Sequence, residues 1–316
     1  MANYKQIDLT GVRTFPIRAR KSKVHAGDFA KVFDPAGGSF SAFVRSLPDI
    51  LAAKDLRSFA GDIRKAVRAR KPVIVMMGAH VVKVGLGPVL VDLIRRGVVS
   101  CVAMNGAAAI HDVETAMWGM TSEDVEETIA DGRFGMSRET GEFINGTIGN
   151  AMVRHDCGYG ESLGRALRKA PNRKLSILAA CYSAGVPVTV HAAIGTDIIH
   201  QQPSMDGAET GEMTFRDFKV LCNVVKKLNG GGVVMNLGSA VIMPEVFLKA
   251  LTVARNLGRN VRGFTTANFD MIQHYRPRMN VISRPTKPGG RGYMFTGHHE
   301  IMIPLLAAMV KELLKR

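Results

Sequence analysis

The feature that most constrains this fold is a local pattern in which a β-branched apolar run ends directly in glycine and polar residues. The pattern occurs at 188–200, VTVHAAIGTDIIH, and again at 229–245, NGGGVVMNLGSAVIMPE. Strands of a parallel sheet are buried on both faces and therefore show apolar runs without alternation. Ligands of such sheets bind beyond the carboxyl ends of the strands. The pattern therefore predicts a cofactor site where these two strands end.

The order of the remaining elements predicts an α/β fold. A strand at 73–77, VIVMM, leads into the turn Gly78-Ala79-His80, a helix at 89–96 and a second strand at 98–104. A strand–helix–strand unit of about 30 residues has the size of a parallel crossover. The alternation predicts a doubly wound, mostly parallel sheet with helices on both faces. The other elements predicted from periodicity are helices at 49–70, 215–228, 244–257 and 301–314, and strands at 176–180, 186–191, 232–237 and 261–267.

We expect residues 1–40 to form a basic N-terminal extension and residues 41–316 to form a single α/β domain. Within that domain, the polar segment at about 121–170 predicts a helical insertion, with Thr121 or Ser122 capping its first helix and a second helix at 139–151.

The first 71 residues hold 15 Lys or Arg against 6 Asp, in a chain whose net charge is +15. A basic arm can bind nucleic acid or an anionic ligand. Here the basic residues are scattered and no aromatic ladder accompanies them, which favours a solvated extension that docks on an acidic neighbouring subunit. We therefore expect no nucleic-acid partner.

No apolar run reaches the length of about 18 residues that a membrane span requires, and the N-terminus lacks an apolar signal-peptide region. We expect a cytoplasmic protein without a membrane partner. Its four cysteines are widely spaced and predict free thiols rather than a disulfide framework; they are Cys101, Cys157, Cys181 and Cys222.

Four stretches of the chain resemble the deoxyhypusine synthase family, whose members use NAD to oxidise spermidine. They are 73–114, 188–200, 229–245 and 263–270, within a resemblance that extends over roughly residues 40 to 312. The resemblance implies an NAD-binding fold, NAD as the cofactor, and a homotetramer with active sites between paired subunits.

The resemblance also implies which residues contact NAD. They follow strands, where small residues let backbone amides approach a pyrophosphate and a carboxylate such as Asp197 accepts hydrogen bonds from a ribose diol. Structural roles remain open for Asp112 and Glu114, which also favour a helix N-terminus, and for His200, which can satisfy a core hydrogen bond. The implied cofactor-binding residues are Gly78, Ala79, His80, Asn105, Gly106, Asp112, Thr196, Asp197, Gly238, Ser239, Thr266, Ala267, Asp270, His298 and His299.

The chain departs from the family at its catalytic lysine. The family carries a Trp-Gly-Lys motif whose lysine forms an imine with substrate, but this chain reads MIQHYRPRMNVISRPTKPGG there, and Trp118 is its one tryptophan. Arg276 and Arg278 lie nearest the lost lysine, and a guanidinium stays protonated and cannot act as an amine nucleophile. Lys287, in a Pro/Gly-rich loop, is the remaining candidate. Pro244-Glu245 replaces a substrate-facing histidine pair of the family.

These residues favour an NAD-dependent transferase or deaminase that transiently oxidises an amine, polyamine or amino-acid substrate, rather than a true deoxyhypusine synthase. Asp112 and Glu245 are expected to hold an ammonium group, while the two arginines hold an acidic group. The predicted catalytic residues are His200, Glu245, His274, Arg276 and Arg278.

Two other classes of protein remain open at this point. One is a non-catalytic protein of the same fold that binds a nucleotide or polyamine, because the nucleophile is lost. The other is a metal-dependent hydrolase, in which the histidines near 298 join His111, Asp112, Asp197 and His200. Adjacent residues on a strand point to opposite faces, so we do not expect His298 and His299 to bind one ion together, and we predict no metal site.

Overall fold

The computed structural model describes residues 4–154 and 157–315. The chain divides into two compact units, Met1–Lys54 and Asp55–Arg316. In the first unit, the 3₁₀ turns η1 (Ile17–Ala19) and η2 (Ala26–Asp28) precede helix α1 (Phe40–Ser46). Ser39 caps α1 by accepting a hydrogen bond from the backbone N–H of Ala42 at 3.1 Å.

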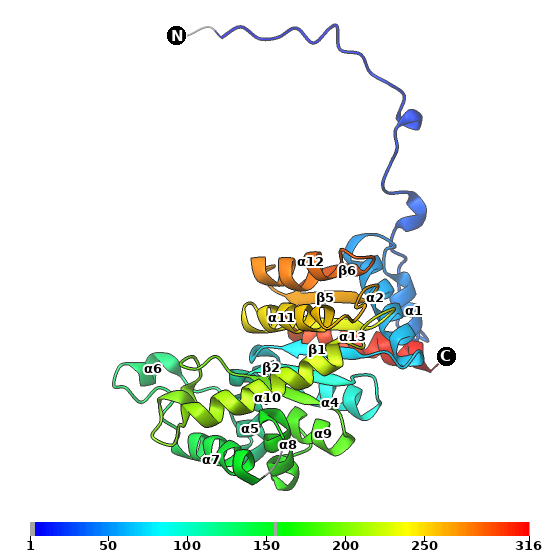
Figure 1. Cartoon of the computed structure of the whole chain (residues 1–316). Coiled ribbons are helices and arrows are strands. Elements are labelled where there is room, and N and C mark those ends of the chain that lie inside the picture. Colours follow the sequence, from blue (N-terminus) through cyan, green and yellow to red (C-terminus); the bar gives the residue numbers. More distant parts are fainter. Residues whose placement is uncertain (1–3, 155–156, 316) are drawn as a thin grey trace. The chain divides into compact units, whose positions relative to one another are not determined.

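The second unit is built on one six-stranded sheet in the order β3-β2-β1-β4-β5-β6. Figure 1 labels β1, β2, β5 and β6 of this sheet. All five strand pairs are parallel. The predicted doubly wound, mostly parallel α/β sheet is therefore confirmed. The strands are β1 (Val73–Met77), β2 (Cys101–Asn105), β3 (Val188–His191), β4 (Val233–Leu237), β5 (Thr265–Asp270) and β6 (Arg291–Thr296).

Helices connect the strands and cover both faces of the sheet. They are α2 (Leu51–Arg68), α3 (His80–Lys83), α4 (Gly87–Arg95), α5 (Gly106–Trp118), α6 (Val125–Ile129), α7 (Arg138–Arg154), α8 (Tyr159–Ala166), η3 (Leu167–Lys169), α9 (Ile177–Ala184), η4 (Ile198–Gln201), α10 (Gly207–Val225), α11 (Ile242–Asn256), the π-helix η5 (Pro277–Ser283), α12 (Arg284–Thr286) and α13 (His299–Leu314).

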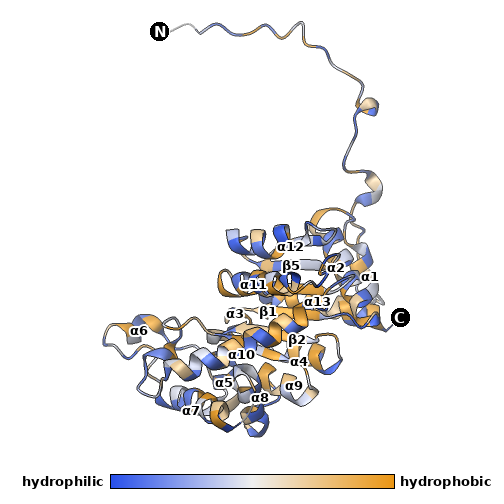
Figure 2. Cartoon of the chain, in the orientation of Figure 1, coloured by the Kyte–Doolittle hydropathy of each residue, from blue (hydrophilic) through white to orange (hydrophobic). Residues whose placement is uncertain are grey.

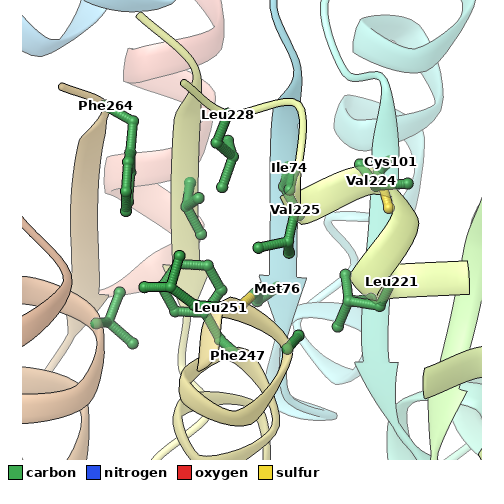
Figure 3. Packing of buried hydrophobic residues seen from close by; sticks show 14 of the residues in the cluster. Ile74, Met76, Cys101, Leu221, Val224, Val225, Leu228, Phe247, Leu251 and Phe264 are labelled. Carbon is green, nitrogen blue, oxygen red and sulfur yellow. The ribbon is translucent and has the colours of Figure 1, made fainter. Parts of the chain in front are cut away.

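One face of the sheet packs against α10, α11 and η5. Figure 3 shows side chains of α10 and α11 on this face, among them Leu221 and Phe247. Ile74 and Met76 of β1 point to this face and meet Leu221 of α10 and Phe247 of α11, all of them fully buried. On the other face, the ring of Phe59 of α2 lies 5.6 to 5.9 Å from three aromatic rings of β5 and β6. Burial on both faces explains the apolar runs, and Figure 2 shows the central strands as hydrophobic.

The structure corrects two predictions of local structure. The predicted strand at 176–180 is the start of helix α9, which Ser176 caps by accepting from the backbone N–H of Ala179 at 3.0 Å. A short apolar run does not distinguish a buried strand from a buried helix. Asp124, not Thr121 or Ser122, caps the first helix after residue 121, because its carboxylate accepts from the backbone N–H groups of Glu126 and Glu127.

The four cysteines are free thiols, as predicted. Among the residues that the structure describes, no helix is long and apolar enough to cross a membrane.

Candidate functional site

The strand order reverses between β1 and β4, and the turns that follow these two strands are in contact. The backbone N–H of Gly78 donates to the carbonyl of Leu237 at 3.0 Å. A Cβ on Gly78 would lie 2.7 Å from the carbonyl oxygen of Gly238, so no larger residue fits without displacing the turn. Gly238 itself has φ +67°, which favours glycine. Such a reversal is the position at which doubly wound folds bind ligands.

Two buried hydrogen-bond acceptors beside this reversal have no partner in residues 4–154 and 157–315. Nε2 of His299 donates to the carbonyl of Phe269 at 3.0 Å, which leaves a lone pair on Nδ1. The amide nitrogen of Asn236 donates to Ser239 and Asn268, while its Oδ1 has no donor. An unpaired buried acceptor is costly. A ligand that carries hydroxyl or amide donors would satisfy both atoms.

A pocket of about 800 Å³ lies at the carboxyl edge of the sheet, beside the N-terminal half of α5. Ala107, Ile110, His111 and Glu114 of α5 form one wall. Trp118, the last residue of α5, extends this wall. The remaining walls include Lys83 of α3, the loop at 120–123, Phe134, two residues of α7 (Glu139 and Thr140), and Thr196 to Ile198. The segment predicted as a helical insertion therefore contributes much of this pocket.

Helix α3 places the pocket next to the strand reversal. Its first residue, His80, has its ring 5.7 Å from the ring of His299. Its last residue, Lys83, lines the pocket. A four-residue helix is only about 6 Å long. A ligand bound at the turns of Gly78 and Gly238 would therefore have one end near the pocket.

Asp197 covers the N-terminus of α5. Its side chain is 6% exposed, and its Oδ2 lies 1.8 Å from the position that a Cβ on Gly106 would occupy. Burial raises the pKa of Asp197 to about 6, although the backbone N–H of Ala107 opposes this by hydrogen bonding to the carboxylate. The carboxylate therefore occupies the place where a helix N-terminus would hold an anionic ligand group.

His200 lies beside Asp197, and its tautomer follows from its backbone partners. Nδ1 accepts from the N–H groups of Gly195 and Asp197, both at 3.2 Å, so Nε2 carries the hydrogen. Nε2 is 3.8 Å from Oδ2 of Asp197. Burial lowers the pKa of His200. The two side chains therefore form a buried pair in which burial disfavours the charged form of each.

A second network lines the pocket around Glu114. Nδ1 of His111 is 2.6 Å from Oγ1 of Thr121, and Thr121 donates to Oε2 of Glu114 at 2.5 Å. Thr140 donates to Oε1 of the same carboxylate at 3.1 Å. Burial raises the pKa of Glu114, but hydrogen bonds from His111, Thr121 and Thr140 outweigh it and the net shift is downward. An ionised glutamate thus lies beside His111, and both residues line the pocket.

Asp112, predicted to bind cofactor or ammonium, lies on the opposite side of α5. It is 1% exposed and accepts hydrogen bonds from the hydroxyl of Ser176 and the backbone N–H groups of Ile177 and Leu178. Burial raises its pKa to about 6 against these hydrogen bonds. All of its observed partners lie at the start of α9, which indicates a structural role.

The predicted catalytic residues Glu245, His274, Arg276 and Arg278 do not line the pocket. Glu245 pairs with Lys249 and with Arg276, and it accepts a hydrogen bond from Asn280 of η5 at 2.8 Å. The hydrogen bond from Lys249 is the main cause that lowers the pKa of Glu245. These contacts join α11 to η5, and the histidine and both arginines are exposed.

The other predicted residues occupy three kinds of position. Asn105 caps α5 through the backbone N–H of Ala108. Thr266 and Ala267 are fully buried within β5, and Asp270 ends that strand. His298 occupies the N-cap position of α13 without a side-chain capping hydrogen bond, and His299 is the first residue of that helix. The two therefore lie at a helix start and not on a strand as we expected. Among the described residues, no group of three or more His, Cys, Asp or Glu side chains is placed to hold a metal ion.

The sequence did not indicate several residues of the pocket. Thr121 and Thr140 lack any motif, and Thr121 was expected only as a possible helix cap. Lys83 follows a predicted turn but carries no spacing signal. The one available signal was that His111 and Glu114 lie three residues apart and therefore share a helix face.

No protein-family model and no curated protein matches this chain. Among solved structures it is similar to a conserved LOR/SDH-like protein from Methanococcus maripaludis S2, with a TM-score of 0.52 and 14% identity over 82% of this chain and 70% of that one. It is similar to AgrE in a ternary complex with ornithine and NAD⁺, with a TM-score of 0.54 and 16% identity over 83% of this chain. This chain spans about a third of AgrE, since the match covers 33% of that protein.

A deoxyhypusine synthase-like protein from Entamoeba histolytica has a TM-score of 0.52 and 12% identity, over 90% of this chain and 98% of that one. Identities this low establish the fold and not the activity. The chain has a deoxyhypusine synthase-like α/β fold, shared with a protein whose solved complex contains NAD⁺.

Proposed function

We propose that this protein is an NAD-dependent enzyme that oxidises an amine or amino-acid substrate at the carboxyl edge of its sheet. The observation that carries the proposal is the contact between Gly78 and Gly238 at the reversal of strand order, with a large pocket one short helix away. The solved complex of AgrE with ornithine and NAD⁺ supports the same combination of cofactor and substrate class.

The residues at the reversal fit a dinucleotide. Gly78 and Gly238 pack closely where the strand order reverses, because a Cβ on Gly78 would lie 2.7 Å from the carbonyl oxygen of Gly238. Nδ1 of His299 and Oδ1 of Asn236 are unpaired acceptors, and NAD carries matching donors in its ribose hydroxyls and its carboxamide. Asp197 already covers the N-terminus of α5. We therefore expect the pyrophosphate to use the turns after β1 and β4 instead.

The pocket fits the charged groups of a small amine or amino acid. Glu114, Glu123, Glu139 and Asp197 supply carboxylates, which suit an ammonium group, and Lys83 can face a substrate carboxylate. Bound NAD would accept a hydride from the carbon that bears the nitrogen. The side chains of the pocket would orient that carbon and accept a proton from the nitrogen.

Calorimetric titration of the full chain with NAD tests the cofactor, and NADH formation with a panel of amines, polyamines and amino acids tests the reaction. Gly78→Ala should weaken NAD binding about tenfold, because its Cβ would lie 2.7 Å from the carbonyl oxygen of Gly238 and must push the two turns apart. Gly211→Ala in α10 is the matched control, because nothing lies within 4 Å of its added Cβ.

Failure of the unmodified chain to bind NAD at millimolar concentration would overturn the proposal. Equal NAD affinity in wild type and Gly78→Ala would show that NAD does not bind at the strand reversal. Tight binding of NAD without turnover across the panel would favour the non-catalytic binding protein instead.

A further inference from the structure

The hydrogen atoms of the network at Glu114 can be assigned by counting donors. Thr121 has one hydroxyl hydrogen, and an ionised carboxylate can only accept. The 2.5 Å contact between Oγ1 of Thr121 and Oε2 of Glu114 therefore uses that hydrogen. The lone pair of Thr121 is then left to accept from Nδ1 of His111 at 2.6 Å. His111 thus carries its hydrogen on Nδ1, and Nε2 carries a lone pair.

That lone pair is available to a ligand. The side chain of His111 is 16% exposed and lines the pocket. Among residues 4–154 and 157–315, the ring of His111 forms its hydrogen bond through Nδ1, to Oγ1 of Thr121. The other ring nitrogen has no protein partner there to block it.

An ionised carboxylate also lies close to His111. Nδ1 lies 3.7 Å from Oε2 of Glu114, whose side chain is 14% exposed. Thr140 fixes the second carboxylate oxygen from a different helix, α7. The net downward shift of the pKa of Glu114 keeps this carboxylate ionised at neutral pH. The other charged groups of the pocket are Lys83, Glu123, Glu139 and Asp197.

We infer that His111 is the proton acceptor of the pocket and that Glu114, acting through Thr121, is its positioning residue. The inference rests on the proposed function for the identity of the proton donor, a substrate ammonium group. The N–H bond of the ammonium breaks and its electron pair stays on nitrogen, while Nε2 of His111 forms a new N–H bond. The product is a neutral amine and an imidazolium paired with Glu114. Only the neutral amine has the lone pair that assists loss of a hydride to NAD.

The first test is independent of turnover. The chain has nine histidines, and nitrogen NMR of protein labelled at histidine nitrogen, with His111→Gln to assign the signal, reports which ring nitrogen carries the hydrogen. We expect the Nδ1–H form in wild type and in Thr121→Ser, which keeps the hydroxyl. We expect Thr121→Val to shift His111 toward the Nε2–H form. An Nε2–H form in wild type, or no change in Thr121→Val, would overturn the proposed hydrogen-bond chain from Glu114 through Thr121 to His111.

The second test uses the amine or amino acid that gives NADH formation. His111→Gln should lower kcat by about 100- to 10,000-fold, the usual contribution of a general base, and should leave NAD affinity unchanged. Thr121→Val and Glu114→Gln should lower kcat less, and Thr121→Ser should restore it.

Unchanged kcat in His111→Gln would overturn the role of this residue while NAD-dependent turnover stands. Absence of NAD binding in wild type would instead overturn the proposed function. The NMR result would then test the hydrogen-bond chain of Glu114, Thr121 and His111 by itself.

Discussion

Asp197 is expected to reduce the stability of the protein at neutral pH, and this can be measured without any ligand. Its side chain is 6% exposed, and burial raises its pKa to about 6 from an ordinary value of 3.8, against the opposing hydrogen bond from Ala107. We predict that Asp197→Asn, which cannot ionise but keeps an acceptor for that N–H group, makes the ligand-free protein more stable at pH 7.5.

The size and sign of the effect follow from linkage. The folded protein holds a proton on Asp197 between about pH 4 and 6, where the unfolded chain has released it. This contribution to stability is complete below pH 3.8 and is lost as the pH rises through about 6. A pKa difference of this size corresponds to about 3 kcal/mol in the free energy of unfolding. The variant should therefore match wild type near pH 4 and exceed it by up to about 3 kcal/mol at pH 7.5.

Urea unfolding at several pH values between 4.5 and 7.5 measures this difference. Fluorescence of the one tryptophan, Trp118, reports on the pocket wall, and circular dichroism reports on the whole fold. Asp124→Asn is the control, because Asp124 caps α6 at an exposed position. It should not stabilise the protein at any of these pH values. A less stable Asp197→Asn at pH 7.5, or a difference that does not vary with pH, would refute the reasoning.

Further predictions concern three residues outside the pocket. Asp217, which is 1% exposed and accepts from the backbone N–H groups of Gly160 and Val190, should destabilise the protein by about 2–6 kcal/mol when changed to Ala, since two buried donors lose their acceptor. Asp206→Ala, which removes an exposed cap of α10, should lower the free energy of unfolding by about 0.5–2 kcal/mol in the same urea experiment. An equal loss of stability in Asp217→Ala and Asp206→Ala would contradict the role of burial. Glu245→Gln should leave NAD affinity within about twofold of wild type, because the observed partners of Glu245 join α11 to η5. A large loss of NAD affinity, measured by calorimetry, would show that Glu245 belongs to the cofactor site.

Much of the fold was predictable because its signals are local. The strand at 73–77 was predicted with its observed bounds, since five apolar residues lie between a Lys-Pro step and a glycine turn. The strand predicted at 261–267 begins and ends too early in the sequence, because the observed strand is Thr265–Asp270. Residues 176–180 were misassigned for the reason that Ile, Leu and Ala form buried helices as readily as short buried strands.

The strand-end turns of the candidate site were predictable, but the walls of the pocket were not. Gly78 and Gly238 follow strands that the sequence identifies, and parallel pairing brings the ends of β1 and β4 together. Thr121 and Thr140 come from the segment between α5 and α7, whose position depends on tertiary packing. Their hydroxyls form no motif along the chain, and only the folded structure shows that both reach Glu114.

Helix geometry separates the roles of the polar residues on α5. Successive residues of a helix are rotated by about 100°, so His111 and Glu114 lie about 60° apart while Asp112 is far from Glu114. The structure has this arrangement, because His111 and Glu114 line the pocket and Asp112 binds the start of α9. The resemblance to a family implies a site role for Asp112, whereas helical spacing favours the pair at 111 and 114. Substitution separates the two readings, since loss of Asp112 should reduce stability in the absence of any ligand, and loss of His111 should reduce turnover in a fully folded protein.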